Sequence, residues 1–175
     1  MGDTLITIIA IALAAVLMFV FPLMTMSDRT DDVAQLTVAT LTAEFVDNIR
    51  TTGRVTEDKY SKFVESIYAT GNTYDIEMEV KVLDENPGKK TTQAEQTKIG
   101  ENVYYSMYTS QILDLIDRNK TLALKEGDIF STSVRNTNTT LSQQLKNFFY
   151  SVVGNDTYSI AAENAGVVTV NGTGR

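Results

Sequence analysis

The chain has 175 residues and a formal net charge of −7 at pH 7, and it contains neither cysteine nor histidine. The lack of cysteine excludes disulfides, cysteine-based zinc sites and thiol nucleophiles, and the lack of histidine excludes serine–histidine triads, histidine general bases and most transition-metal sites. The acidic charge, with no basic run longer than Lys89-Lys90, argues against nucleic-acid binding. We therefore expect a protein that is not an enzyme, with no cofactor, no metal ion and no evident small-molecule substrate.

The first element is an uncharged apolar segment at residues 5–26, LITIIAIALAAVLMFVFPLMTM. As a helix it would be about 33 Å long, which matches the ~30 Å hydrocarbon core of a bilayer. Thr7 and Thr25 can return their hydroxyls to the helix backbone. We predict a transmembrane anchor at residues 1–27, and we expect the lipid bilayer and neighbouring helices to contact Leu5, Ala10, Ala12, Ala14, Ala15, Phe19, Phe21 and Pro22.

Two other kinds of apolar segment, a cleaved signal peptide and a buried core helix, fit residues 5–26 less well than an anchor does. A cleaved signal peptide has a basic amino terminus, a shorter apolar run and an A-x-A-like site, whereas residues 1–3 carry no basic side chain and residues 25–27 make a poor cleavage site. A buried core helix that is apolar on every face would need a much larger protein around it. A retained single-pass anchor in the cell membrane is therefore expected.

Two features of the sequence make opposite predictions for the side of the membrane on which residues 28–175 lie. Arg29 lies close to the carboxyl end of the anchor, and the positive-inside rule would place it in the cytoplasm. The rest of the chain is acidic and rich in Thr and Asn, and long polar domains translocate despite their charges. We expect an extracytoplasmic domain.

Two helices are predicted after the anchor. Residues 31–50 predict an amphipathic helix with the apolar stripe Val33, Leu36, Leu41, Phe45 and Ile49. No proline or glycine separates this helix from the anchor after Pro22, so the two could form one rod that ends at residues 51–53. A second helix is expected to start at the N-cap Thr56, to stop at Gly71, and to carry the stripe Tyr60, Phe63, Val64 and Ile67.

The remainder predicts antiparallel strands mixed with helices, which makes the domain α+β. Residues 73–83 alternate apolar and charged side chains, as a strand with one buried and one wet face does. Residues 84–88 predict a turn, 89–97 an exposed loop, 99–107 a strand or a helix, 110–117 a helix and 129–136 a strand. A helix from Thr139 to Gly154 and two short strands at 157–162 and 167–170 complete the domain.

Three acids and three tyrosines are the candidate partner contacts. Asp28, Asp31 and Asp32 follow the anchor, where they could pair with a basic partner, bind a divalent cation or favour the first turn of a helix through its dipole. The three tyrosines could anchor an interface or fill the core, and they are Tyr104, Tyr105 and Tyr108.

One further acidic pair, Glu77 and Glu79, projects from the wet face of the 73–83 strand. Solvation is the simplest role for such side chains. A carboxylate-dependent hydrolase would need this pair in a pocket, and no catalytic motif accompanies it.

Several segments resemble tight-adherence (Tad-type) pilus proteins. These are AEFVDNIRTTG at 43–53, VLDENPGKKTTQ at 82–93, KIGENVYYS at 98–106 and GNDTYSIAA at 154–162. Together with an apolar helix ahead of a small head, they resemble TadE-like minor pseudopilins or uncharacterised pilin-like membrane proteins of bacteria. Two features depart from the pilin pattern: no basic residue precedes Gly2, and cleavage after Gly2 would place Thr7 where pilins usually carry a glutamate.

The resemblance implies a non-enzymatic structural or assembly component of a bacterial surface pilus or secretion apparatus. Its apolar helix would lie in the membrane before assembly and pack against protein partners afterwards. The alternative is a membrane-tethered extracytoplasmic binding module that never joins a filament.

Overall fold

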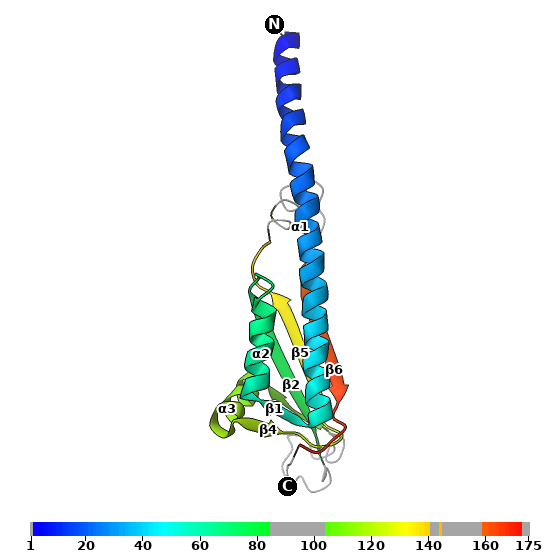
Figure 1. Cartoon of the computed structure of the whole chain (residues 1–175), viewed down its shortest axis with the longest axis vertical. Helices are drawn as coiled ribbons and strands as arrows, with labels where there is room; N and C mark the ends of the chain where they lie inside the picture. The colour runs from blue at the N-terminus through cyan, green and yellow to red at the C-terminus, as the bar shows by residue number, and fades with distance from the viewer. Residues whose placement is uncertain (1, 85–103, 141–143, 145–158, 173–175) are drawn as a thin grey trace, which may run out of the picture.

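The computed structural model describes residues 2–84, 104–140, 144 and 159–172. Strands β3 (Tyr104–Tyr108), β2 (Tyr74–Leu83), β5 (Ile129–Asn136) and β6 (Ala161–Val167) form, in that order, an antiparallel sheet. Helices α1 (Gly2–Thr52) and α2 (Glu57–Tyr68) lie side by side over one face of this sheet (Figure 1). The predicted α+β class, with an amino-terminal helix and antiparallel strands, is confirmed.

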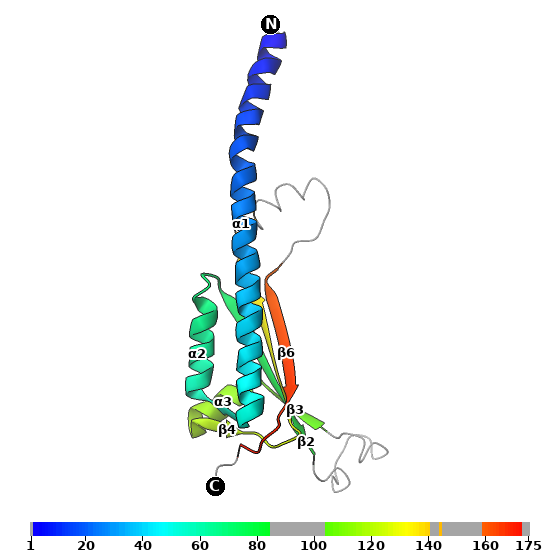
Figure 2. The ribbon, with the colours of Figure 1, turned by 45° about the vertical axis from the view of Figure 1, so that its right-hand side comes forward.

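Helix α1 is one continuous rod of 51 residues that runs through Pro22. Its amino-terminal half stands clear of the domain and its carboxyl-terminal half packs along the sheet (Figure 2). The rod ends at Gly53, whose N–H donates to the carbonyl of Ile49 at 2.7 Å and whose φ of 63° is a left-handed value that favours glycine. The prediction of a single rod ending at residues 51–53 is confirmed.

The apolar stripe predicted for the lower half of α1 is partly wrong. Phe45 and Ile49 are buried, but Val33 and Leu36 are 64% and 69% exposed. At 3.6 residues per turn, Val33 and Phe45 lie roughly 120° apart around the helix, so one face cannot bury both. The buried face instead combines small side chains, which allow the sheet to approach, with larger apolar ones, and it comprises Asp31, Ala34, Val38, Thr42, Phe45, Val46 and Ile49.

The two shorter helices follow their predicted signals. The Thr56 hydroxyl caps α2 by accepting from the Lys59 N–H at 3.3 Å, and Phe63 and Ile67 form its buried face. Helix α3 (Thr109–Asn119) closes one side of the sheet and buries Ile112 and Ile116. Both predicted helices are confirmed, although α2 ends at Tyr68, three residues before the predicted stop at Gly71.

The strands are those predicted in two cases and differ in the others. Strand β2 covers the alternating segment and β5 covers residues 129–136, so both of these predicted strands are confirmed. The two strands pair with each other. Strand β3 shows that the described part of residues 99–107 is extended rather than helical. The short pair β1 (Arg54–Thr56) and β4 (Thr121–Ala123) was not predicted, because three residues are too few to show a period.

The described residues 159–172 contain one strand, where two were predicted between residues 157 and 170. Strand β6 runs through residues 163–166, which were expected to separate strands at 157–162 and 167–170. A Cβ at Gly166 would lie 2.9 Å from Cδ of Arg50, so glycine here lets α1 lie close to the strand rather than marking a turn. The predictions for residues 85–97 and for most of the 139–154 helix lie outside the described residues.

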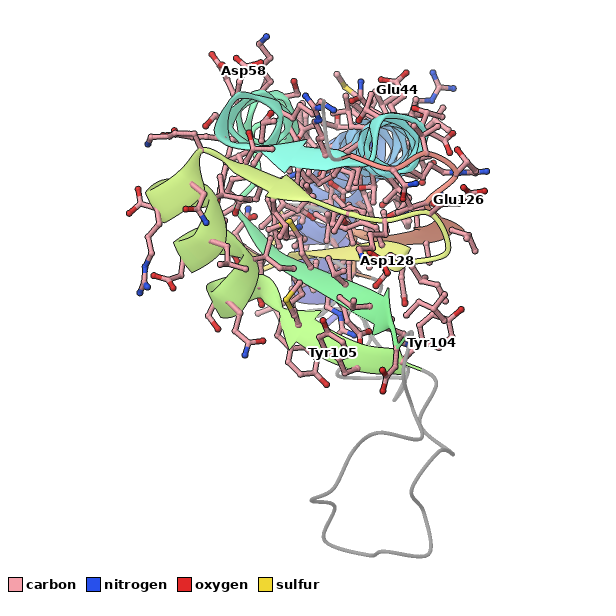
Figure 3. The ribbon with its side chains drawn as sticks, turned by 90° about the horizontal axis from the view of Figure 1, so that it is seen from below. Glu44, Asp58, Tyr104, Tyr105, Glu126 and Asp128 are labelled. Carbon is pink, nitrogen blue, oxygen red and sulfur yellow. The ribbon has the colours of Figure 1, made fainter. Side chains whose placement is uncertain are left out.

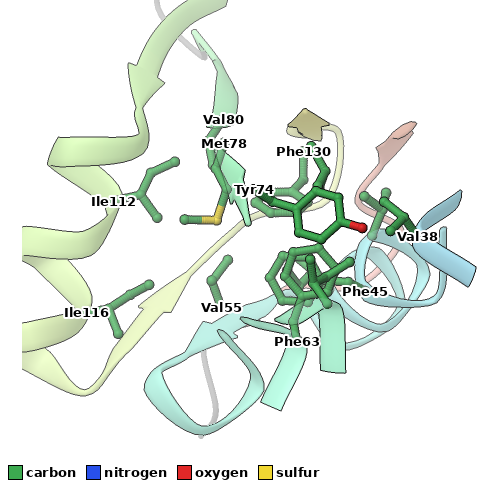
Figure 4. Packing of buried hydrophobic residues seen from close by; sticks show 14 of the residues in the cluster. Val38, Phe45, Val55, Phe63, Tyr74, Met78, Val80, Ile112, Ile116 and Phe130 are labelled. Atoms are coloured by element: carbon green, nitrogen blue, oxygen red, sulfur yellow. The ribbon is translucent and has the colours of Figure 1, made fainter. Parts of the chain in front are cut away.

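The core lies between the helices and the sheet (Figure 4). The rings of Phe45 and Phe63 stack with centroids 4.2 Å apart, and Phe130 meets Phe45 edge-on at 5.7 Å. These contacts join α1, α2 and β5 through one aromatic cluster. The lower half of α1 is thus an integral part of the domain.

The buried carboxylate of Asp128 connects the end of β2 to the turn that precedes β5. Asp128 accepts from the Leu83 N–H at 2.9 Å through one oxygen and from the Lys125 N–H at 2.8 Å through the other. Two backbone donors that would otherwise lie at strand ends are thereby satisfied. This turn holds β2 and β5 in register where the domain is farthest from the amino terminus.

Candidate functional site

The amino-terminal half of α1 is the most exposed apolar surface among the described residues. By length and composition it is the one described helix that could cross a membrane, and none of its apolar window is buried against the domain. The hydroxyls of Thr7 and Thr25 donate to the carbonyls of Asp3 and Phe21 at 2.7 and 3.0 Å, as predicted for polar groups in a span. This half of the helix is therefore compatible with a membrane anchor.

The predicted packing residues of the anchor lie on several sides of the helix. Leu5, Phe19 and Phe21 are exposed, as are the four alanines and Pro22. The helical period places Ala12 and Ala15 on a different side from Ala10 and Ala14. The small residues therefore offer close approach on more than one face.

The three acids after the anchor do not form one surface. Asp31 is only 7% exposed and accepts from the Thr140 hydroxyl at 2.6 Å, whereas Asp32 is exposed and Asp28 is half-buried. Asp31 is therefore unavailable to a partner and instead ties α1 to the segment after β5. Within the described ranges, no group of three acidic side chains is placed to hold a metal ion.

The three tyrosines lie on the edge strand β3 rather than in the core. Tyr104 and Tyr108 share the register rows of Leu83 and Glu79, and Tyr105 lies on the opposite face beside Val82. All three are exposed, Tyr108 by 61%. They are accessible for a partner contact but do not present a single aromatic patch.

The open face of the sheet forms a shallow acidic concavity of about 630 Å³. Glu77 lies in one register row with Ser133 and Glu163, and Glu79 lies in the next row with Tyr108. Asp75 and Arg135 also border the concavity and face each other across β2 and β5. Lys81 lies farther along the same face of β2, with its Nζ 3.9 Å from a carboxylate oxygen of Glu79. Glu77 and Glu79 thus lie on a wet face, as predicted, where carboxylates, serines and a tyrosine could bind a polar or basic ligand.

Sequence reasoning missed a groove between α1 and α2 on the side away from the sheet. Its upper part is bordered by Val33, Thr37 and Ala69, and its lower part by Glu44 and Lys62. A pattern in the sequence could have predicted this groove. Small residues recur at three- and four-residue spacing in both segments, as Thr30, Ala34 and Thr37 in α1 and as Ser66, Ala69 and Thr70 at the end of α2 and just after it.

One lysine at the lower end of this groove has a perturbed pKa. Lys59 donates to the Thr52 hydroxyl at 2.6 Å and to the Arg54 carbonyl at 3.2 Å. Partial burial, with a smaller effect from the Arg54 charge, lowers the pKa of Lys59 below its ordinary value. Lys59 is thus held in place within the domain, whereas Lys62 is exposed and pairs with Asp58 at 2.9 Å.

In comparisons with known proteins, the chain matches no family model, no curated protein and no solved structure. The arrangement itself is therefore the basis for a functional proposal.

Proposed function

We propose that this chain is a non-enzymatic structural or assembly component of a bacterial surface pilus or secretion apparatus, of the kind that TadE-like pseudopilins represent. The observation that carries this proposal is the shape of α1. One rod is half exposed and apolar, and half built into a domain core through Phe45 and Ile49. Because the helix is continuous, a partner that packs against its exposed half also fixes the position of the domain at its other end. A pilus subunit that is held in an assembly by its helix needs such a connection.

The domain is proposed to be extracytoplasmic, with residues 5–26 in the bilayer before assembly. Two side chains support a surface for helix packing that continues beyond the span: Val33 and Leu36 are exposed apolar residues below the membrane boundary. These two side chains lie three residues apart on α1, so they form a small patch that continues the exposed apolar surface of the span.

Crowding the small residues of the anchor should impair assembly. With Ala14→Leu and Ala15→Leu combined, we expect the amount of the protein in sheared surface fibres to fall by about tenfold or more, because overpacking a helix contact costs roughly 1–3 kcal/mol. The measurement is immunodetection of the sheared fraction from cells that make the protein. The matched control is Ile8→Leu with Ile9→Leu, which conserves volume in the same segment.

Equal fibre content in the two double variants and the wild type would count against the proposal, provided that all three reach the membrane in equal amounts. A protein that stays in the membrane and is absent from sheared fibres in its wild-type form would support the second candidate, a tethered binding module. The acidic concavity on the open sheet face is the observation that favours this second function.

A further inference from the structure

The continuous helix α1 sets the distance between the domain and the bilayer. With residues 5–26 across the hydrocarbon core, Thr30 and Asp31 lie about 6 and 7.5 Å beyond Met26, at 1.5 Å per residue. The headgroup layer on each side of a bilayer is roughly 5–8 Å thick. Any part of the domain that lies level with these two residues therefore reaches the headgroups.

Two segments of the domain lie at this level. The turn between α2 and β2, residues 69–73, stands at the upper end of the domain and borders the upper part of the α1–α2 groove beside Thr30 (Figure 1). The segment that follows β5, residues 137–140, reaches the same level, because the Thr140 hydroxyl donates to Asp31 at 2.6 Å. These two segments form the upper end of the domain.

Hydrogen bonds join the two segments into one surface. The side-chain oxygen of Asn138 accepts from the Thr73 N–H at 2.9 Å, and the side-chain nitrogen of Asn138 donates to Asn72 at 3.2 Å. The Thr137 N–H donates to the Thr73 carbonyl at 2.9 Å, so the segments are also connected through their backbones. Thr139 is exposed at this end, where its hydroxyl can reach a headgroup oxygen.

The described residues of the upper end carry no charged side chain. Their side chains are hydroxyl groups, amides, one methyl group and one hydrogen atom, on Ala69, Thr70, Gly71, Asn72, Thr73, Thr137, Asn138, Thr139 and Thr140. The charged residues at this level lie on α1 itself; Asp31 is bonded to Thr140, and the other three are Asp28, Arg29 and Asp32. Hydroxyl and amide groups can donate hydrogen bonds to the phosphate and ester oxygens of lipids without bringing a net charge to the membrane.

The lower end of the domain has the opposite character. Glu57 and Lys120 form an ion pair there at 2.8 Å. Seen from below, Asp58 and Glu126 are directed outward from this end (Figure 3). A bilayer with anionic lipids repels acidic side chains over about 8 Å at physiological salt. The uncharged end is therefore the end of the domain that can approach such a surface most closely.

We propose that the upper end of the domain rests on the lipid headgroups, with its hydroxyl and amide groups bonded to their phosphate and ester oxygens. This inference rests on the membrane anchor of the proposed function, and it adds a second contact with the bilayer beside the span. The two contacts together hold the domain at a fixed height, with its charged end directed away from the membrane.

Fluorescence quenching tests this contact, because single cysteines can be labelled in a chain that has none of its own. A nitrobenzoxadiazole label is placed on Ala69→Cys or Thr139→Cys at the upper end. The matched control is Glu126→Cys, which lies near Leu124, whose N–H donates to the Gly53 carbonyl at the far end of α1. Each full-length protein is reconstituted alone into phosphatidylcholine vesicles that contain headgroup-spin-labelled phosphatidylcholine.

The labels at the upper end should each lose about half or more of their fluorescence, because the quencher lies in the layer that these residues reach. The label on Glu126→Cys should lose almost none, since it stands roughly 30 Å farther from the bilayer along α1. The circular dichroism spectrum of each variant reports whether the domain is folded.

A second variant raises the domain without changing the anchor. Seven helix-forming polar residues, Gln-Ala-Gln-Gln-Ala-Gln-Gln, are inserted between Ser27 and Asp28. They lengthen α1 by about 10.5 Å and rotate the domain by only about 20°. Quenching of the label on Thr139→Cys should then fall about threefold or more, because the upper end leaves the headgroup layer.

A label on Leu13→Cys, in the middle of the span, separates the headgroup contact from the anchor. Lipids spin-labelled in the acyl chain should quench it. The headgroup contact is overturned if Leu13→Cys is quenched in this way while the labels at the upper end are not quenched by the headgroup probe. It is also overturned if Glu126→Cys is quenched as strongly as Thr139→Cys, or if the insertion leaves quenching at Thr139→Cys unchanged.

The remaining outcomes distinguish this contact from the proposed function. A Leu13→Cys label that the acyl-chain probe does not reach would overturn both, because the anchor is their common premise. Normal surface fibres without headgroup quenching would refute the contact and leave the proposed function standing. Full headgroup quenching of a protein that is absent from fibres would refute the proposed function and leave the contact standing.

Discussion

The Phe45→Ala variant is expected to lose about 3–5 kcal/mol of the free energy of unfolding. Phe45 is the one aromatic side chain of α1 that is stacked on Phe63 of α2 and meets Phe130 of β5 edge-on, so its removal leaves a cavity where three elements join. Guanidinium unfolding of the full chain in a mild detergent, followed by near-ultraviolet circular dichroism of the tyrosines, measures the change. The midpoint of thermal unfolding should fall by roughly 10 °C.

The matched control is Leu36→Ala, on the same helix. Because Leu36 is exposed, the free energy of unfolding should change by less than about 0.5 kcal/mol. Equal losses in the two variants would show that the buried face of α1 has been assigned wrongly.

The Gly53→Ala variant is expected to lose about 3 kcal/mol of the free energy of unfolding. A left-handed backbone costs an alanine about 1–2 kcal/mol, and the added Cβ would collide with the carbonyl of Val170 and the backbone of Gly172. Because these neighbours are backbone atoms, the tail must move, at a further cost of roughly 1–3 kcal/mol. Chemical unfolding under the conditions used for Phe45→Ala measures the loss.

Gly71→Ala separates the two contributions. Gly71 also has a left-handed φ, 85°, but its added Cβ would meet no atom within 4 Å. This variant should lose only about 1 kcal/mol, from the backbone conformation alone. A Gly53→Ala loss no larger than that of Gly71→Ala would contradict the close approach of the carboxyl-terminal tail to the end of α1.

The elements predicted correctly from the sequence have strong local signals. The rod α1 has no breaker between Pro22 and Gly53, and β2 alternates apolar and charged residues over its full length. The face of α1 that meets the sheet was mispredicted because Val33 and Leu36 are apolar but exposed, whereas Ala34 and Thr42 are small or polar but buried. The sheet packs closely against α1, so the size of a side chain, and not only its hydrophobicity, decides which face of the helix is buried.

The parts that could not be predicted depend on distant contacts. Strand β6 contains Glu163, Asn164 and Gly166, which are poor strand formers, and its conformation is imposed by pairing with β5. The hydrogen bond from Thr140 to Asp31 joins residues 109 positions apart. The groove combines two helices whose facing sides are defined only once both pack on the sheet.

The orientation of the anchor is the central claim, and labelling of single cysteines tests it most directly. Glu126→Cys places a thiol on the exposed lower end of the domain, and Leu13→Cys places one in the middle of the span. With a membrane-impermeant maleimide, Glu126→Cys should react on intact spheroplasts, and Leu13→Cys should stay unlabelled before and after lysis. Labelling of Glu126→Cys only after lysis would contradict an extracytoplasmic domain, and full labelling of Leu13→Cys would contradict a membrane-spanning α1.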